Sequence, residues 1–190
     1  MKPAQLLLTI GATLVSLSAH AHTGHDTHSL LAGLSHPFGA DHLLAMVAVG
    51  AWSVVALPAA RSWQGPAAFV LALVMGAVLG WAGLQLPGQE QAIALSVIGS
   101  GALLWAVRSR IGASWGLALV TGAGALHGLA HGAEAPATGF GGYALGFVLT
   151  TLALHGMGVW VGLALRQRAW VLGGLGALLS LSGVALFAQL

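Results

Sequence analysis

Almost none of the 190 residues in this chain carries a charge, and this constrains its fold more than any motif does. Charged residues make up 5% of the sequence and apolar residues 57%. A soluble domain has about a quarter charged residues, so this chain cannot cover itself with a hydrated surface. We therefore predict an all-α integral membrane protein that lies in a lipid bilayer, because a helix satisfies its own backbone hydrogen bonds within lipid.

The composition also excludes several classes of protein. The six basic residues are scattered, whereas a nucleic-acid-binding protein needs a clustered basic face, so we expect no nucleic-acid partner. Without cysteine the chain has no disulfides and no thiolate metal sites. Its glycine-rich stretches, such as residues 139–142, lack the Lys-Ser/Thr pair of a phosphate-binding loop, so we expect no ATPase activity.

The first residues have the pattern of a targeting segment. Met1-Lys2 is followed by an apolar stretch over residues 6–17 and by the small-residue motif Ala19-His20-Ala21. This pattern predicts a signal peptide over residues 1–21 that is cleaved before His22. The alternative is an uncleaved first transmembrane helix. After cleavage, residues 22–35 would form a histidine-bearing tail outside the membrane.

Six apolar runs follow, each near the roughly 20 residues that a membrane-spanning helix needs. They occupy residues 37–58, 66–86, 91–107, 112–132, 139–165 and 169–189. We therefore predict a six-helix transmembrane permease domain over residues 36–190. Two halves of three spans would run in opposite directions, as in many transporters, although no sequence similarity links the two halves.

The basic residues orient these spans. All five in the predicted mature chain fall in the first, third and fifth loops, at Arg61, Arg108, Arg110, Arg166 and Arg168. Cytoplasmic loops carry an excess of basic residues, so both termini are predicted to lie outside. This indicates a multi-pass protein of the bacterial inner membrane whose histidine-bearing tail faces the periplasm. A homo-oligomer is left open.

The first span begins with a group of ionisable residues. His36 precedes Pro37, and Asp41-His42 would lie a turn or more inside the apolar zone. An ionisable group at that depth is costly and normally faces a cavity or a partner. Met46, four residues after His42, would lie on the same face. The alternatives are a buried Asp–His hydrogen bond that only joins two helices, and a methionine that only packs.

The fourth span ends with a second such group. His127 and His131 are four residues apart and therefore project from one helical face, and Glu134 can join them from the rim. A stripe of glycines, rotated about 100° from the histidines, runs beside them at Gly124, Gly128 and Gly132. Glycine stripes allow close helix packing, so we expect the histidine face to be held against the first span. The alternative is a helix contact with interfacial histidines.

Three further positions are secondary candidates. His155 would lie about 25 Å along the fifth span, where it is either an exit-side relay for a cation or a histidine bonded to a backbone carbonyl. His22 and His25 in the tail, together with the new α-amine, would capture a divalent cation, unless the tail is only a flexible polar segment. Glu90 falls in an outer loop.

These residues offer imidazole nitrogen and carboxylate oxygen, a ligand set that suits Ni²⁺, Co²⁺ or Zn²⁺ better than Cu⁺ or Mg²⁺. The predicted metal ligands are His36, Asp41, His42, His127, His131 and Glu134. The secondary candidates are His22, His25, Met46, Glu90 and His155. Their graded depth indicates a path inward for a transported ion, so we expect a divalent metal ion as the partner and no bound cofactor.

Two segments resemble the signatures of a known family. The first-span sequence from His36 to Met46 and the fourth-span sequence from His127 to Glu134 are similar to those of HupE/UreJ proteins, which are secondary permeases for nickel and in some cases cobalt. The resemblance covers the whole chain. It implies that the metal serves a nickel enzyme such as urease or hydrogenase. It also implies roles in uptake for five of the predicted ligands and draws attention to Glu90 and Phe69. The five are His36, Asp41, His42, His131 and Glu134.

One spacing departs from the family pattern. Four residues separate His36 from Asp41-His42, where the family usually has five, and the shorter spacing resembles that of the separate nickel/cobalt transporter family. In a continuous helix this shortening would rotate His36 by about 100°. His36 remains a ligand candidate if Gly39-Ala40 is unwound.

The sequence thus predicts a secondary transporter that imports Ni²⁺, with Co²⁺ as the second candidate ion, and no enzyme. Two alternatives belong to other classes. One is an intramembrane zinc hydrolase with Glu134 as its general base. The other is a non-transporting metal sensor that binds the ion at the outer rim.

Overall fold

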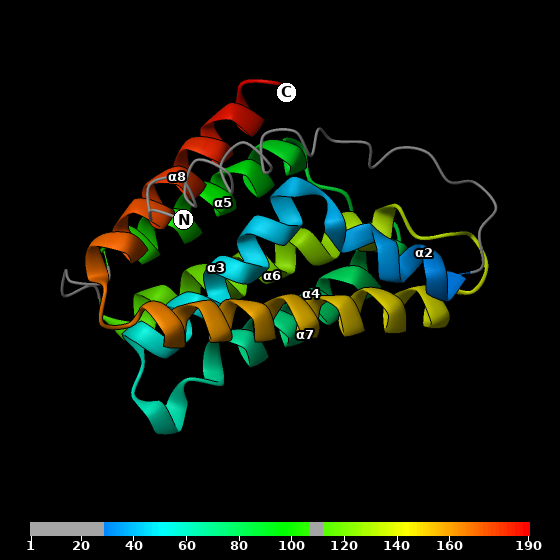
Figure 1. Cartoon of the computed structure of the whole chain (residues 1–190). Helices are drawn as coiled ribbons and strands as arrows, with labels where there is room; N and C mark the ends of the chain where they lie inside the picture. Colours follow the sequence, from blue (N-terminus) through cyan, green and yellow to red (C-terminus); the bar gives the residue numbers. More distant parts are fainter. Residues whose placement is uncertain (1–28, 107–111) are drawn as a thin grey trace.

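The computed structural model describes residues 29–106 and 112–190, and this part of the chain contains helices and turns but no strand (Figure 1). The α-helices are α2 (Ser29–Ser35), α3 (Ala40–Ala56), α4 (Gln64–Trp81), α5 (Gln89–Trp105), α6 (Ala113–Ala133), α7 (Phe140–Leu165) and α8 (Ala169–Phe187). Two short 3₁₀ helices are η1 (His36–Phe38) and η2 (Ala59–Arg61). The predicted signal peptide and the tail residues His22 and His25 lie outside the described residues.

The last five predicted spans each correspond to one helix, α4 to α8. The first does not, because the chain bends by 74° between Ser29–Phe38 and Ala40–Ala56. Gly39 marks the break, and its ψ of 142° ends the helical path before α3 begins. Pro37 therefore lies in η1. The long helix α3 begins at Ala40 and not at residue 37, where the predicted first span begins.

Three helical segments of the described chain are long and apolar enough to cross a membrane: Ala59–Trp81, Phe140–Leu165 and Ala169–Phe187. The bent pair α2–α3 makes a fourth candidate if it forms one broken span. Helix α5 has only 17 residues, and α6 contains five glycines and two histidines, which lower its hydropathy. Large apolar side chains such as Leu71, Met75 and Leu181 lie more than 60% exposed on the outer surface, as expected of helices that face lipid.

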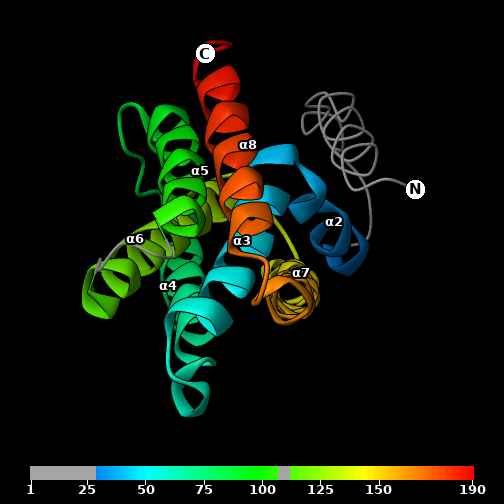
Figure 2. The same cartoon turned by 60° about the vertical axis from the view of Figure 1, so that its left-hand side comes forward.

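Glycine contacts hold the helices in close pairs. Gly76 and Gly80 of α4 lie against the backbone of α6, and Gly101 and Gly176 join α5 to α8. Helix α7 packs along α2 through its first half and along α3 through its second half. Helix α3 is central: it contacts all five of the other long helices, and ten of its 17 residues are buried. Figures 1 and 2 both show α5 and α8 side by side.

The two halves of the bundle, α3–α5 and α6–α8, share one packing plan. Gly50 of α3 meets the backbone of His155 in α7, and Gly128 of α6 meets the backbone of Leu73 in α4. A residue of α3 and its counterpart in α6 are therefore 78 positions apart, as residues 50 and 128 are. A residue of α4 and its counterpart in α7 are 82 positions apart, as residues 73 and 155 are. The same two separations relate the contact of Gly158 with Val47 to that of Gly76 with Ala125.

The halves run in opposite directions. At one end of α3, His42 lies beside His127, and at its other end the ring of Trp52 covers Gly116. Residue numbers therefore rise along α3 as they fall along α6, and these two helices are antiparallel. The described helices thus show the inverted relation that a three-plus-three arrangement requires, even though the two halves share no evident sequence similarity.

Candidate metal site

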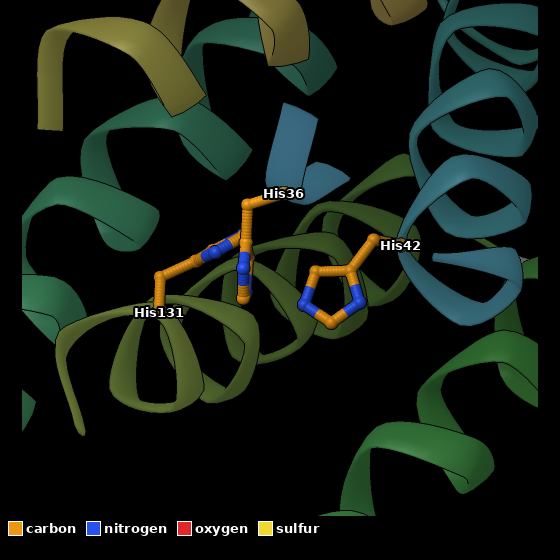
Figure 3. Close-up of side chains that lie close together, drawn as sticks. All are labelled: His36, His42 and His131. Carbon is orange, nitrogen blue, oxygen red and sulfur yellow. The ribbon is translucent and has the colours of Figure 1, made fainter. Parts of the chain in front are cut away.

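Three imidazoles converge where the bend between η1 and α3 meets the end of α6 (Figure 3). They belong to His36, His42 and His131, and one ring nitrogen from each lies within 4.8 Å of the others. The ring of His131 is 4.6 Å from that of His36 and 4.7 Å from that of His42, between centroids. Each histidine comes from a different element, so the fold assembles the group.

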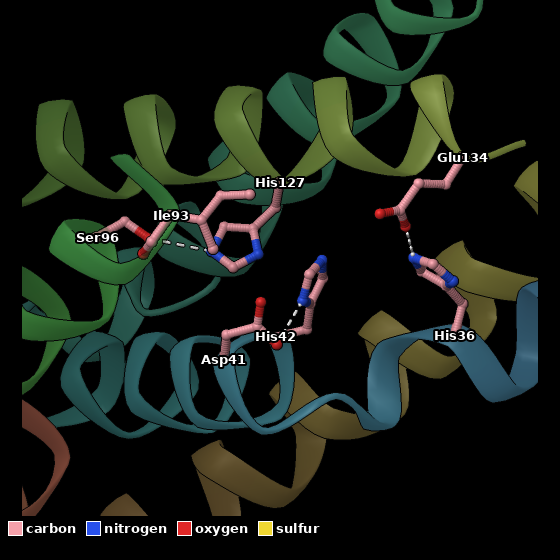
Figure 4. A network of polar contacts seen from close by, with 7 residues as sticks. All are labelled: His36, Asp41, His42, Ile93, Ser96, His127 and Glu134. Atoms are coloured by element: carbon pink, nitrogen blue, oxygen red, sulfur yellow. Dashed lines mark hydrogen bonds and ion pairs between the residues drawn. The ribbon is translucent and has the colours of Figure 1, made fainter. Parts of the chain in front are cut away.

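The break at Gly39 brings His36 into this group. Because residues 36–41 do not form a continuous helix, the rotation expected from their spacing does not apply. The Nε2 atom of His36 lies 2.9 Å from Oε2 of Glu134. Glu134 follows the last residue of α6, so this contact joins the first predicted motif to the second at the rim of the bundle (Figure 4).

Asp41 orients the ring of His42. Its Oδ1 atom lies 2.8 Å from Nδ1 of His42, and a carboxylate can only accept, so the Nδ1–H group donates. In the neutral ring the lone pair is then on Nε2, which is buried and has no hydrogen-bond partner among the described residues. A carboxylate that holds one nitrogen of a histidine while the other faces a metal is a recurrent arrangement in metal sites.

Ser96 of α5 orients His127 in a similar way. The Ser96 hydroxyl donates to the carbonyl of Ile93 at 2.7 Å, and its oxygen lies 3.0 Å from Nε2 of His127. Since its one hydrogen is already donated, the hydroxyl accepts from Nε2–H. The lone pair of His127 is therefore on Nδ1, which is buried and unpaired within the described part of the chain. The His127 ring lies 4.6 Å from that of His42.

His131 lies at the centre of the group. Its side chain is fully buried, and neither ring nitrogen has a hydrogen-bond partner in the described structure. Phe147 of α7 stacks on its ring at 4.7 Å with an interplanar angle of 6°, which fixes the ring plane. Tyr143, one turn earlier, lies 5.7 Å from the ring of His36.

The six predicted ligands thus form one connected network. Exposure of their side chains falls from 35% at Glu134 and 25% at Asp41 to 14% at His36 and 10% at His42. His127 and His131 are fully buried. The network therefore runs from the surface of the bundle into its interior. Figure 4 shows its members other than His131 in a row that runs from Glu134 toward Ser96.

The glycine stripe of α6 packs on α4. Added side chains at Gly124, Gly128 and Gly132 would meet the backbone of residues 69–81. The histidine face, about 100° away, meets His42 of α3 as predicted. Close packing of α6 on α4 thus holds the histidines of α6 against α3.

The secondary candidates lie in different places. Met46 is fully buried within the hydrophobic core, and Glu90 is exposed in the first turn of α5. Nδ1 of His155 lies 2.8 Å from the carbonyl oxygen of Thr151, as in the backbone-bonded alternative. Nε2 of His155 has no hydrogen-bond partner among the described residues.

Sequence reasoning did not identify Ser96, Tyr143 or Phe147. The one signal for Ser96 is its spacing of four residues from Ser100, which puts two hydroxyls on one face of an apolar helix. Aromatic residues are ordinary in membrane helices, so the sequence offers no signal that Phe147 stacks on a histidine.

The chain matches the family described as HupE / UreJ protein over residues 10–186. It is 43% identical over 162 residues to Protein HupE of Rhizobium leguminosarum bv. viciae, an alignment that covers 84% of this chain and 83% of that relative. No solved structure matches it. With its predicted motifs joined in one network and a family match over nearly its whole length, the chain belongs to the HupE/UreJ family.

Proposed function

We propose that this chain is a secondary transporter that imports Ni²⁺, with Co²⁺ as the second candidate ion, for a nickel enzyme such as urease or hydrogenase. The observation that carries the proposal is the convergence of His36, His42 and His131 at one end of a membrane-helix bundle. Family membership supports it, because HupE/UreJ proteins are associated with nickel and cobalt transport.

The donor set favours a borderline divalent ion. Imidazole nitrogens suit Ni²⁺, Co²⁺ and Zn²⁺, and the orientation of His42 by Asp41 presents a lone pair. Two nitrogens that bind one ion at about 2.1 Å each lie at most about 4.2 Å apart. The three nitrogens lie within 4.8 Å of one another, so small side-chain movements suffice to close the site around an ion.

The charges also suit a cation. Asp41 and Glu134 both contact histidines of the group and offset the two charges of the ion. Neither is deeply buried, so hydration shares the cost of holding them ionised. An ion that must leave again needs several sites of moderate affinity, and a set of ligands in graded depth supplies them.

The proposed orientation has six spans, a cleaved signal peptide and both termini outside, with the ion entering from the periplasm through the inner membrane. Arg61 follows α3, and Arg166 and Arg168 follow α7. Helices α3 and α7 run in parallel, with Val47 beside Gly158, and the histidine group lies at their beginnings. The arginines therefore lie at the opposite end from the histidines, which supports histidines outside and arginines inside.

The test is accumulation of ⁶³Ni²⁺ in cells that express the wild type, Asp41→Asn or His42→Ala. Ser182→Ala is the control, because within the described residues its exposed hydroxyl donates to the Leu178 carbonyl of its own helix α8. We expect uptake by the wild type and the control and none by the two site variants, at equal membrane levels on a blot. A wild type that accumulates no nickel above background would refute the import function.

The same experiment separates the alternatives. A zinc hydrolase with Glu134 as its base needs a free carboxylate beside an ion, whereas Oε2 of Glu134 is paired with His36. Neither a hydrolase nor a sensor would move metal across the membrane. Accumulation that depends on Asp41 and His42 therefore distinguishes a transporter from both.

A further inference from the structure

We propose that His155 is a second, transient binding site for the transported ion, deeper in the bundle than the histidine group and linked to it through the ring of Phe69, which contacts both His127 and His155. The inference rests on the proposed import function. It concerns the route of the ion after the entry site, and it assigns that route to a third helix, α7.

The residues form a continuous series through three helices. His127 lies four residues before His131 in α6, or about 6 Å along the axis. The Phe69 ring of α4 is 5.8 Å from that of His127 and 5.0 Å from that of His155, between centroids. His155 itself lies eight residues, or about 12 Å, beyond Phe147, the aromatic residue that stacks on His131.

His155 presents a ligand atom to which no other described residue hydrogen-bonds. Its Nδ1–H donates to the carbonyl of Thr151 at 2.8 Å, because a carbonyl oxygen can only accept. Nε2 therefore carries the lone pair. This atom is buried and has no hydrogen-bond partner within the described residues, and the side chain is only 2% exposed. An unpaired buried acceptor is costly, and a passing cation would satisfy it.

The same face of α7 carries a second candidate ligand for the ion. The hydroxyl of Thr151 is also buried without a partner in the described part of the chain. It lies one turn before His155 on the same face of α7. An imidazole nitrogen and a hydroxyl oxygen, completed by water, are suitable ligands for a borderline divalent cation.

The surroundings favour brief occupancy. The described contacts of His155 include an aromatic ring and a backbone carbonyl but no carboxylate. The face of an aromatic ring attracts a cation weakly, so Phe69 lowers the cost of passage without trapping the ion. Conduction needs sites of this kind, which are favourable enough to enter and weak enough to leave.

The decisive variant is His155→Asn. Its amide nitrogen can donate to the carbonyl of Thr151 as Nδ1–H does, but it has no counterpart of Nε2. We expect ⁶³Ni²⁺ binding to the purified full-length protein in detergent to be unchanged, because the entry site is intact. We expect the maximal uptake rate in cells to fall about tenfold or more, with an unchanged half-saturating nickel concentration.

Other results would contradict the proposal. Normal uptake by His155→Asn would show that His155 only packs and bonds to Thr151. Loss of nickel binding by the purified variant would assign His155 to the integrity of the entry site. Thr151→Val, which keeps the backbone carbonyl, should lower the rate but not the binding, while Ser182→Ala should change neither. If the proposed function itself is wrong, the wild type accumulates no nickel, and this result is distinct from any difference between the wild type and the variants.

Discussion

At the scale of single residues, neighbours decide which nitrogen of each histidine faces the interior. Asp41 engages Nδ1 of His42, and Ser96 engages Nε2 of His127. In each ring one nitrogen is hydrogen-bonded to a neighbouring side chain, and the other has no hydrogen-bond partner among the described residues. The sequence indicated which imidazoles belong together, but the free nitrogen depends on a partner from another turn or helix.

Removal of the Ser96 hydroxyl should loosen His127. In Ser96→Ala, Nε2 of His127 loses its acceptor, so the ring can change tautomer and turn its lone pair away from His42. We expect nickel uptake to fall about tenfold, measured as ⁶³Ni²⁺ uptake over a range of nickel concentrations. Ser100→Ala is the matched control, since Ser100 lies one turn on in α5 and its buried hydroxyl has no partner in the described structure. Equal effects of both substitutions would contradict the role of Ser96.

At the scale of helices, the sequence predicted most of the fold because apolar runs and their charged or glycine-rich ends mark helices directly. It did not predict the bend at Gly39, because the local sequence is compatible with a helix start at Pro37. The bend depends on α2, which packs on the first half of α7 through Gly33 and Gly146. This tertiary contact, absent from any periodicity, brings His36 to Glu134.

The glycine stripe of α6 gives a direct test of close packing. A side chain at Gly128 would meet the carbonyl of Leu73, whereas one at Gly122 would meet open space. Both substitutions by alanine gain the same helix propensity. We expect Gly128→Ala to destabilise the protein by about 1–3 kcal/mol and to reduce uptake, because His127 and His131 move with the helix. Thermal unfolding in detergent measures the difference, and a Gly128→Ala variant as stable as Gly122→Ala would argue against it.

At the scale of the whole molecule, opposite charges lie at opposite ends of the bundle. The carboxylates of Asp41, Glu90 and Glu134 lie near the beginnings of α3 and α5 and the end of α6. Among the described residues, the arginines lie beyond the ends of α3 and α7. This polarity and the inverted packing of the two halves support the proposed entry of the ion at the histidine end.

Cysteine labelling tests the orientation. The chain has no cysteine, so a single introduced thiol reports without background. Gln85 lies in the exposed connection between α4 and α5, and Ala60 lies exposed beside Arg61. We expect Gln85→Cys to react with a membrane-impermeant maleimide in spheroplasts, and Ala60→Cys to react only after permeabilisation. The reverse pattern would place the histidine group in the cytoplasm and contradict entry of the ion from the periplasm.

The charge of the ion sets the energy source of the proposed transport. Fixed carboxylates do not change the charge that is moved, and the described residues hold none between the histidine group and the arginine end. At about 100 mV, inside negative, the inward movement of two charges gains about 4–5 kcal/mol, which is enough for accumulation without ATP. In proteoliposomes, a potassium diffusion potential set with valinomycin should accelerate ⁶³Ni²⁺ uptake when the lumen is negative, and Asp41→Asn vesicles should not respond. Uptake by the wild type that ignores the potential would mean that counter-movement of another cation balances the charge.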